Sequence, residues 1–370
     1  MEKVLITATL MSHIAQFHKP LIRMLKNAGY EVHIAAKDNL SSKNGLKIDL
    51  IDKAFNIDFA RSPLSFKNMK AYKKMKRVIK DNKYEYIHCN TPMGGLITRM
   101  AANPERKKGT KVFYTVHGFH FYKGAPKLNW ILFYPIEKFM SRLTDVLITI
   151  TKEDYELAKK KKFKCTVRYI DGVGVNTSKF NTETLAKNQI SVLSKENFNI
   201  LNIGELNNNK NQIFILESLY QLLEKFPQVR LYIAGNGPNY DMLNNYIIDN
   251  NLQDNVFLLD YVLEIEKYIQ ACDLIVSSSY REGLPLNIME AMTCGKPILA
   301  SDNRGHRELI EDGYNGFLYE VNNITQFNGI IANLIEDTSL ADHIAANAKI
   351  ESRKYSDLNI SKQLEVIYFE

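Results

Sequence analysis

A chain of 370 residues, 45% of them hydrophobic and 24% charged, is long enough for about two folded domains and is not a disordered protein. Its four cysteines lie far apart, which argues against a disulfide framework or a zinc site, and no run approaches the ~18 apolar residues of a membrane span, so we expect a cytoplasmic protein. The net charge of +7 divides into +19 over residues 1–190 and −12 over residues 191–370, which suggests two domains with different partners.

Short β-branched runs alternate with helical patterns in the first half of the chain, which is typical of βαβ units and a parallel sheet. We predict strands at residues 3–10, 31–36, 84–89, 111–116 and 145–150, and helices that include residues 66–82 and 128–143. Ligands of such sheets bind beyond the carboxyl ends of the strands. The residues directly after each strand are therefore the candidates for function.

Three segments carry the candidate residues of the first half. His117, His120 and Lys123 follow one strand directly, and a histidine there can position a substrate or donate a hydrogen bond to a phosphate or hydroxyl group. Both histidines could instead be ordinary loop residues with satisfied hydrogen bonds. Two other segments complete the same predicted rim, and they contribute Ser12, His13, His18, Gly94 and Gly95.

The rhythm of strands and helices restarts after a polar, weakly periodic segment. We predict strands at residues 198–204, 229–235, 256–260, 273–279, 296–301 and 316–320, with helices between and after them. The chain is therefore predicted to form two doubly wound α/β domains, residues 1–175 and 197–354, joined by a linker at 176–196. Two such sheets that face each other would form a cleft.

The segment REGLPLNIMEAMTCG, after the fourth of these strands, has the features of a helix start that binds an anionic ligand. Pro285 suits the first turn, Gly283 lets a ligand approach the backbone, and the amides of the helix start favour a phosphate. Glu282, outside the helix, and Glu290, inside it, could accept hydrogen bonds from hydroxyl groups of the same ligand, which fits a nucleotide-sugar. The alternative is an exposed Glu282 and an ordinary helix-surface Glu290.

Two further loops of the second half have glycines directly after a strand. Gly204 ends one strand, and Lys210 opens the next helix, where its ammonium could reach phosphate oxygens; such a lysine is more often simply solvated. Gly235 and Gly237 form a tight turn that resembles a phosphate loop, although these glycines could serve only to let the cleft close. The sequence has no His-x-x-x-His pattern and no Asp-x-Asp after a strand of the basic half, so we expect no metal, and we expect no other cofactor. A serine nucleophile elbow is also missing.

Residues 281–318, REGLPLNIMEAMTCGKPILASDNRGHRELIEDGYNGFL, resemble the Glu-x7-Glu region of the retaining glycosyltransferases of family 4, which have the two-domain fold called GT-B. The resemblance covers essentially the whole chain and includes GELNNNKN, AGNGP and DGVGVNTSKF. The first half, with HCNTPMGGLITR and VHGFHFYKGAP, resembles the bacterial capsule and exopolysaccharide branch. The resemblance implies a GT-B fold of two Rossmann-like domains facing a cleft, with the acceptor on the N-terminal domain and the last helix, residues 355–370, crossing back to it.

The resemblance also implies roles for individual residues. Glu290 would bind the ribose hydroxyls of the donor nucleotide, and Glu282 would bind hydroxyls of the donor sugar. Lys210 would neutralise the departing diphosphate, and His117 would contact the transferred sugar, so that His117, Glu282 and Lys210 form the predicted catalytic set. The whole predicted donor site comprises Gly204, Glu205, Lys210, Gly235, Gly237, Arg281, Glu282, Gly283, Leu284, Pro285 and Glu290.

One departure from the family pattern concerns the diphosphate. The family has an arginine directly after the glycine that is Gly204 here, whereas this chain has Glu205. Either another cation substitutes, for which Arg281 is a candidate, or Glu205 points away from the site. Asp171 replaces the asparagine that is common in the linker motif.

A basic segment and an aromatic segment of the first half suit a peripheral membrane contact. Residues 65–83 carry seven lysines and arginines from Lys67 to Lys80, and the other segment carries Trp130, Phe133 and Tyr134. The alternative is that Trp130 and Phe133 belong to the core, since a spacing of three also fits a buried helix face. We expect a cytoplasmic protein that binds the anionic inner face of the cell membrane.

The predicted reaction is a retaining transfer of a hexose or N-acetylhexosamine from a nucleotide-sugar, for which we expect UDP, to a polyprenyl-diphosphate-linked glycan in surface polysaccharide synthesis. The same fold also leaves open a nucleotide-sugar 2-epimerase or a glycogen-type phosphorylase. Glu205 leaves open a nucleotide-binding subunit that has lost its activity. Nucleic acid is not an expected partner, because the basic half has no recognisable binding motif.

Overall fold

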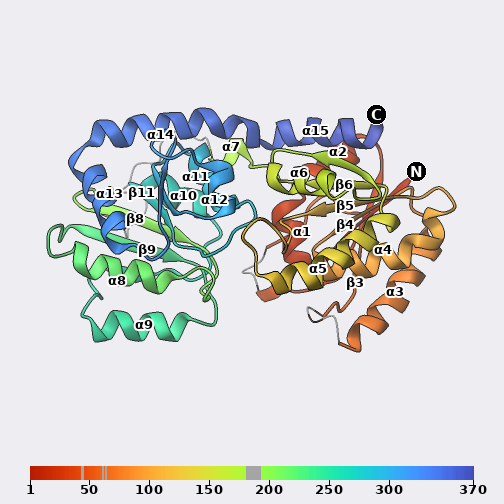
Figure 1. The fold of residues 1–370 in the computed structure, drawn as a ribbon, viewed down its shortest axis with the longest axis horizontal. Helices are drawn as coiled ribbons and strands as arrows, with labels where there is room; N and C mark the ends of the chain where they lie inside the picture. The colour runs from red at the N-terminus through yellow and green to blue at the C-terminus, as the bar shows by residue number, and fades with distance from the viewer. Residues whose placement is uncertain (43–45, 61, 63–64, 181–192) are drawn as a thin grey trace. The chain divides into compact units, whose positions relative to one another are not determined.

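The computed structural model describes residues 1–42, 46–60, 62, 65–180 and 193–370, and the chain divides into two compact units. The N-terminal unit comprises Met1–Gly174 together with Asp357–Glu370, and the C-terminal unit comprises Val175–Ser356 (Figure 1). Most of the predicted linker, residues 181–192, lies outside the described residues, and its first part forms the short helix α7 of the C-terminal unit.

The N-terminal unit contains a sheet of seven parallel strands in the order β3-β2-β1-β4-β5-β6-β7. The strands are β1 Lys3–Leu10, β2 Glu31–Lys37, β3 Lys53–Asn56, β4 Tyr86–Asn90, β5 Lys111–Val116, β6 Val146–Thr149 and β7 Thr166–Tyr169. The chain moves outward from the centre in both directions, so the strand order reverses between β1 and β4. Ligands of doubly wound sheets bind beyond the carboxyl ends of the strands at such a point.

Helices cover both faces of this sheet. They are α1 Met11–Phe17, α2 Lys19–Asn27, α3 Lys67–Asn82, α4 Pro92–Arg106, α5 Lys127–Met140, α6 Lys152–Lys160 and α15 Asp357–Phe369, with short 3-10 helices at Leu40–Ser42 and Ser141–Leu143. The last helix belongs to the core of this unit, because the buried Tyr368 ring stacks on Phe113 of β5 with 4.2 Å between centroids, and its hydroxyl group hydrogen-bonds His88 of β4.

The C-terminal unit contains six parallel strands in the order β10-β9-β8-β11-β12-β13, so here the order reverses between β8 and β11. The strands are β8 Phe198–Ile203, β9 Val229–Ala234, β10 Val256–Leu258, β11 Leu274–Ser277, β12 Ile298–Ser301 and β13 Phe317–Tyr319. The helices are α7 Thr177–Phe180, α8 Gln212–Leu222, α9 Tyr240–Asp249, α10 Ile265–Ala271, α11 Leu286–Thr293, α12 Arg304–Leu309, α13 Ile324–Glu336 and α14 Thr338–Ser352, followed by a 3-10 turn at Arg353–Tyr355.

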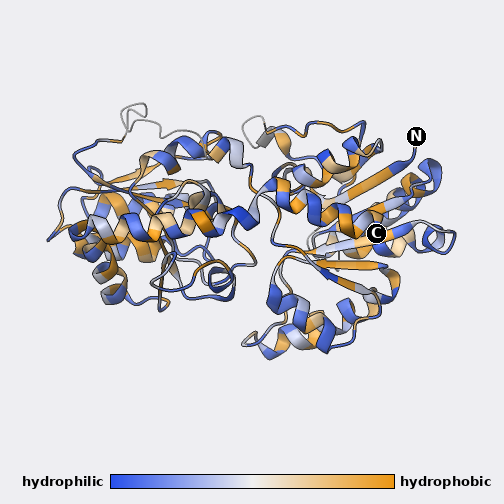
Figure 2. Ribbon diagram, turned by 90° about the horizontal axis from the view of Figure 1, so that it is seen from above, coloured by the Kyte–Doolittle hydropathy of each residue, from blue (hydrophilic) through white to orange (hydrophobic). Residues whose placement is uncertain are grey.

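The prediction of two doubly wound α/β domains is confirmed, and each predicted strand is present. Two strands, β3 and β7, were not predicted. Both lie at the edges of the N-terminal sheet, and at least half of their residues are exposed, so they lack the continuous apolar run that identifies a central parallel strand. Figure 2 shows that apolar residues concentrate on the strands of the sheets, while the helices carry many polar residues.

Helix α5 lies on the core with the aromatic face that was considered for a membrane contact. The apolar core of the N-terminal unit packs against Trp130, Phe133 and Tyr134. The alternative interpretation, in which these residues belong to the core, is therefore confirmed. The opposite face of α5 is exposed and apolar, and it comprises Leu128, Ile131, Leu132, Ile136 and Phe139. Among the described residues, no helix combines the length and apolar character that crossing a bilayer requires.

A buried ion pair connects α5 to α4. Arg99 is 1% exposed, stacks on the Tyr114 ring at 3.8 Å, and donates hydrogen bonds of 3.0–3.2 Å to both carboxylate oxygens of Glu137. Its Nε also donates to the carbonyl of Gly95 at 3.0 Å. A charge buried this deeply depends on its partner, because removing one member leaves the other uncompensated.

We therefore expect Glu137→Ala to lower the free energy of unfolding of the N-terminal unit by about 3 kcal/mol. Urea unfolding followed by the fluorescence of Trp130, the single tryptophan, reports on this unit specifically. Glu105→Ala is the matched control, because Glu105 pairs with a lysine whose side chain is 69% exposed and such pairs contribute at most about 1 kcal/mol. Equal losses in the two variants would contradict the prediction.

Candidate functional site

The candidate site of the C-terminal unit lies at the carboxyl ends of β8 and β11, where the strand order reverses. Hydrogen bonds tie the loops after these two strands together. The Ser278 hydroxyl lies 2.7 Å from the carbonyl oxygen of Lys210, and the Tyr280 amide donates to the carbonyl of Asn209 at 2.8 Å. The Asn209 side chain donates in turn to the carbonyl of Arg281 at 3.0 Å. The two loops therefore form one surface.

Lys210 and Glu282 form an ion pair across this surface. The Lys210 Nζ lies 2.6 Å from Glu282 Oε1, and the two side chains are 21% and 14% exposed. Burial alone would raise the pKa of the Glu282 carboxyl, but the Lys210 charge and hydrogen bonds from Lys210 and Ser279 outweigh it and hold that pKa below its ordinary value. The pair therefore places a fixed positive and a fixed negative charge at the loop that leads into α11.

The glycines after β8 and β9 are explained by close packing. A Cβ atom on Gly235, whose φ is +150°, would lie 1.9 Å from the carbonyl oxygen of Gly204, and one on Gly237 would lie 2.4 Å from that of Leu206. A Cβ atom on Gly204 would lie 3.2 Å from the Cε atom of Lys210. Gly204 thus allows the lysine side chain to pass over the strand end, while Gly235 and Gly237 let the two loops approach each other.

Helix α11 has the start and end that its sequence indicates, with a shift of one residue. It begins at Leu286, and Pro285 occupies the N-cap position with extended backbone rather than the first turn. It ends at Thr293, and Gly295 adopts the positive φ of +63° that suits a glycine beyond a helix end. Glu282 precedes the helix and Glu290 lies inside it, half-buried.

Glu205 does not neutralise Lys210. The Glu205 side chain is exposed and accepts a hydrogen bond from the Asn207 side chain at 3.1 Å, whereas the Lys210 ammonium pairs with Glu282. Arg281, the candidate for a substitute cation, is also exposed. Of the described residues at this site, Lys210 is the cation that the fold holds in a partly buried position.

Helix α12 supports the loop of Glu282, and the sequence analysis did not identify it. A Cβ atom on Gly305 would lie 2.6 Å from the Cβ atom of Glu282, so only a glycine allows this contact. The next residue, His306, is fully buried, and its Nδ1 lies 2.6 Å from the carbonyl oxygen of Ser301. Asn303 caps the helix by accepting hydrogen bonds from the amides of Gly305 and His306. The Asn-x-Gly-His run was the available signal.

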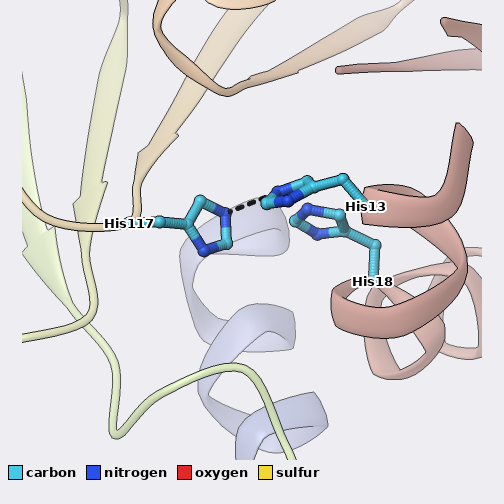
Figure 3. Close-up of side chains that lie close together, drawn as sticks. All are labelled: His13, His18 and His117. Carbon is cyan, nitrogen blue, oxygen red and sulfur yellow. Dashed lines mark hydrogen bonds between the residues drawn. The ribbon is translucent and has the colours of Figure 1, made fainter. Parts of the chain in front are cut away.

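The candidate site of the N-terminal unit is a cluster of three histidines. His13 and His18 follow β1, on α1 and directly after it, and His117 follows β5. Figure 3 shows the three rings converging, with His13 Nε2 and His117 Nε2 3.3 Å apart. Ring centroids lie 4.6 Å apart for His13 and His117, 5.3 Å for His13 and His18, and 5.5 Å for His18 and His117.

The three histidines are uncharged at neutral pH. Burial lowers the pKa of His117 to about 4 and, together with the neighbouring rings, holds the pKa values of His13 and His18 well below the ordinary range. The cluster therefore presents imidazole lone pairs rather than positive charge.

The other residues of the predicted rim have separate surroundings. Ser12 is buried, and its backbone amide and hydroxyl group both hydrogen-bond the Asn39 side chain. His120 stacks on Phe133 of α5 with 4.6 Å between centroids, and Lys123 is exposed.

Gly94 and Gly95 bring the start of α4 against the sheet. Cβ atoms on them would lie 2.8 Å from the carbonyl carbon of Ala8 and 2.6 Å from the Tyr114 ring. Packing within the unit accounts for both glycines.

Comparison with known proteins relates both halves of the chain to glycosyltransferases. Residues 184–351 match the family described as glycosyl transferases group 1, and residues 4–151 match the family described as glycosyl transferase 4-like. The chain is 37% identical to EpsD of Bacillus subtilis, named as a glycosyltransferase, over 99% of this chain and 96% of that protein. It is 27% identical to the UDP-Gal:alpha-D-GlcNAc-diphosphoundecaprenol alpha-1,3-galactosyltransferase of Escherichia coli, over 90% of this chain and 87% of that protein.

A solved structure has the same fold over its full length. The structure of HepE from Anabaena in complex with UDP and glucose matches with a TM-score of 0.76 and 21% identity, and the match covers 100% of both chains.

The histidine cluster predicts a specific loss of stability in acid. A histidine whose pKa is lowered by folding binds its proton more readily in the unfolded state, so its contribution is complete above about pH 6.5 and declines as the pH falls toward the folded-state value, about 4 for His117. Each such histidine adds a slope of up to about 1.4 kcal/mol per pH unit. We expect His13→Gln/His18→Gln to show a shallower pH dependence than the wild type.

Urea unfolding of the N-terminal unit, followed by Trp130 fluorescence between about pH 7 and pH 5, measures these slopes. His343→Gln is the control, because His343 lies on α14 of the C-terminal unit and is not buried. If the double variant kept the slope of the wild type, the cluster would not be the origin of the acid sensitivity.

Proposed function

Since the chain belongs to the family 4 glycosyltransferases, whose fold is GT-B, we propose that it transfers one sugar from a UDP-sugar to a glycan carried on a lipid diphosphate. The observation that carries the donor assignment is the Lys210–Glu282 ion pair beside the start of α11. The E. coli relative is named for a UDP-sugar donor and a diphosphoundecaprenol acceptor, which supports both substrate classes.

A diphosphate would bind at the start of α11 and compete with Glu282 for Lys210. The amides of Gly283, Leu284 and Leu286 and the positive end of the helix dipole favour an anion there, and the Lys210 ammonium supplies a full charge. Once Lys210 contacts the phosphate, the Glu282 carboxylate becomes available to accept hydrogen bonds from sugar hydroxyls. Glu290, further along the same helix, would accept hydrogen bonds from the ribose.

The chemistry requires stabilisation of the negative charge that develops on the departing diphosphate. Preorganised amides and a partly buried lysine can provide such stabilisation without a metal ion, once the phosphate has displaced Glu282 from Lys210. We propose retention of configuration, with the leaving phosphate as the base and no protein nucleophile. For His117 we propose contact with the transferred sugar, as its resemblance to the family implies.

The acceptor would be presented at a membrane, and the N-terminal unit has a surface that suits one. Helices α3, α4 and α5 lie on one face of its sheet, since α3 packs on α4 and Arg99 of α4 pairs with Glu137 of α5. The exposed apolar residues of this surface are Phe66, Met69, Met100, Leu128, Ile131, Leu132, Ile136 and Phe139. Exposed basic residues on α3 are Lys67, Lys70, Lys73, Lys74, Lys76, Arg77 and Lys80. We propose that this α3–α5 face contacts anionic lipid, in the synthesis of a capsule or another surface polysaccharide.

The donor assignment predicts which substitutions weaken nucleotide binding. We expect calorimetry to show binding of UDP in preference to GDP and ADP, and Glu290→Ala and Lys210→Ala each to weaken it at least about 10-fold, because each removes a charge-assisted hydrogen bond worth about 1.5–3 kcal/mol. Lys225→Ala is the control, since Lys225 pairs with Glu336 on the exposed surface of the same unit.

Binding of GDP or ADP instead of UDP would support the proposed nucleotide site but would contradict the proposal that the donor is a UDP-sugar. If none of the three nucleotides bound, the Glu205 departure would have disabled the diphosphate site, and a nucleotide-binding subunit without activity would also be excluded.

The α3–α5 face predicts membrane binding through α5. We expect Ile131→Ser/Leu132→Ser to weaken binding to vesicles that contain phosphatidylglycerol at least about 10-fold. The double variant lacks two apolar side chains that would transfer from water into the lipid when the protein binds. Co-sedimentation with these vesicles measures the binding, and comparing low with high salt measures how much of the binding is electrostatic. Ile350→Ser is the control, because Ile350 on α14 is equally exposed but belongs to the C-terminal unit. Binding unchanged by the double substitution would show that another surface contacts the lipid.

A further inference from the structure

Asn90 connects β4 to β1 and to His117. It is the last residue of β4 and is fully buried. Its side-chain amide donates a hydrogen bond to the carbonyl oxygen of Thr7 on β1 at 3.2 Å. Because a carbonyl oxygen can only accept, the NH2 group of Asn90 faces Thr7 and its side-chain oxygen faces the other way. That oxygen lies 3.5 Å from His117 Nε2.

The orientation of Asn90 decides which nitrogen of His117 carries the proton. Within the described part of the chain, His117 Nε2 is the group that can donate to the Asn90 side-chain oxygen. A bare Nε2 would leave this buried oxygen facing a lone pair, whereas buried polar atoms are normally satisfied. The distance is long for a hydrogen bond, but such bonds in substrate sites often shorten when the substrate binds. The proton is therefore on Nε2.

His13 agrees with this assignment. Its Nε2 lies 3.3 Å from His117 Nε2, and the two rings meet edge-on at an interplanar angle of 81°. Two protonated nitrogens would repel each other at this distance, so His13 Nε2 is an acceptor and the proton of His13 is on Nδ1. The other titratable groups beside these rings are His18 and His88, and burial keeps both uncharged at neutral pH. These histidines therefore bring no charge that would favour an imidazolium at His117.

The Nδ1 atom of His117 is left with a lone pair. A neutral imidazole has one proton, and the hydrogen bonds of His117 within the described residues both involve Nε2. The family resemblance implies a contact between His117 and the transferred sugar, but it does not say which ring nitrogen makes the contact or which partner donates. The surroundings of Nε2 answer both questions.

We propose that Asn90 is a positioning residue: it holds the His117 proton on Nε2, so that Nδ1 accepts a hydrogen bond from a hydroxyl group of the transferred sugar. The sugar contact rests on the proposed function, whereas the position of the proton does not. A lone pair at this point favours a sugar with a hydroxyl group there and disfavours an ionised carboxylate, which can only accept. The donor is therefore expected to carry a neutral sugar and not a uronic acid.

The position of the proton can be tested on the wild type alone. Nitrogen NMR of the full chain with isotope-labelled histidine distinguishes protonated from bare ring nitrogens, and the signals missing in His117→Gln identify His117. We expect a protonated Nε2 and a bare Nδ1 at neutral pH. A proton on Nδ1 would overturn the proposal, and this result does not depend on any variant at position 90.

The role of Asn90 can be tested with Asn90→Asp. The new carboxylate still accepts from Nε2, but it raises the pKa of His117 and so favours the imidazolium, which has no lone pair. Calorimetry with UDP-glucose, UDP-galactose, their N-acetylamino forms, UDP-glucuronate and UDP identifies the preferred neutral sugar. We expect Asn90→Asp to lose affinity for that UDP-sugar about 5-fold between about pH 8 and pH 6, in proportion to one hydrogen bond, with no such loss in the wild type.

UDP and a matched variant provide the controls. Affinity for UDP should be the same in Asn90→Asp as in the wild type, because Asn90 is not part of the proposed nucleotide site. Asn347→Asp, which puts a carboxylate beside His343 on α14, should leave sugar binding unchanged. A loss in Asn90→Asp that is equal at both pH values would reduce Asn90 to a structural role and overturn the proposal.

Two further outcomes separate this inference from the proposed function. Tighter binding of UDP-glucuronate than of every neutral UDP-sugar would overturn the inference while UDP binding still supported the donor site. Failure of UDP itself to bind would contradict the proposed function and, with it, the sugar contact of His117.

Discussion

The constraint on which both candidate sites depend is the parallel sheet. Each connection between parallel strands must return over a face of the sheet, so the carboxyl ends of all strands collect at one edge. In the C-terminal unit this brings Lys210, after β8, against Glu282, after β11, although they are 72 residues apart. In the N-terminal unit it brings His13, after β1, against His117, after β5. Backbone topology, rather than any local motif, therefore creates the chemistry.

The sequence predicted the central strands and the functional loops because both carry a local signal. Buried parallel strands are continuous apolar runs, and a glycine or proline after such a run marks the turn into the next helix. Edge strands such as β3 lack that signal because they are exposed. The Lys210–Glu282 pair could not be predicted, because pairing depends on the relative position of two loops. The convergence of the three histidines could not be predicted for the same reason, because they come from different segments of the chain.

Helix α5 shows a different limit of sequence reasoning. Its residues are apolar around much of the helix circumference. The periodicity of the sequence is therefore a weak signal, and it does not identify the face that packs against the core. The structure shows that the rings of Trp130, Phe133 and Tyr134 pack against the core, while the opposite face, which includes Phe139, remains exposed. The ion pair between Glu137 on α5 and the buried Arg99 on α4 holds the helix in this rotation.

The position of α15 has a consequence for how the protein reaches its folded state. Residues 357–370 complete the core of the unit formed by the first 174 residues, with Tyr368 stacked on Phe113 and bonded to His88. During translation, the N-terminal sheet leaves the ribosome well before this helix exists. The apolar surface that α15 covers therefore lacks its covering helix while the whole C-terminal unit is synthesised, and an exposed apolar surface of this kind favours aggregation until the last helix docks.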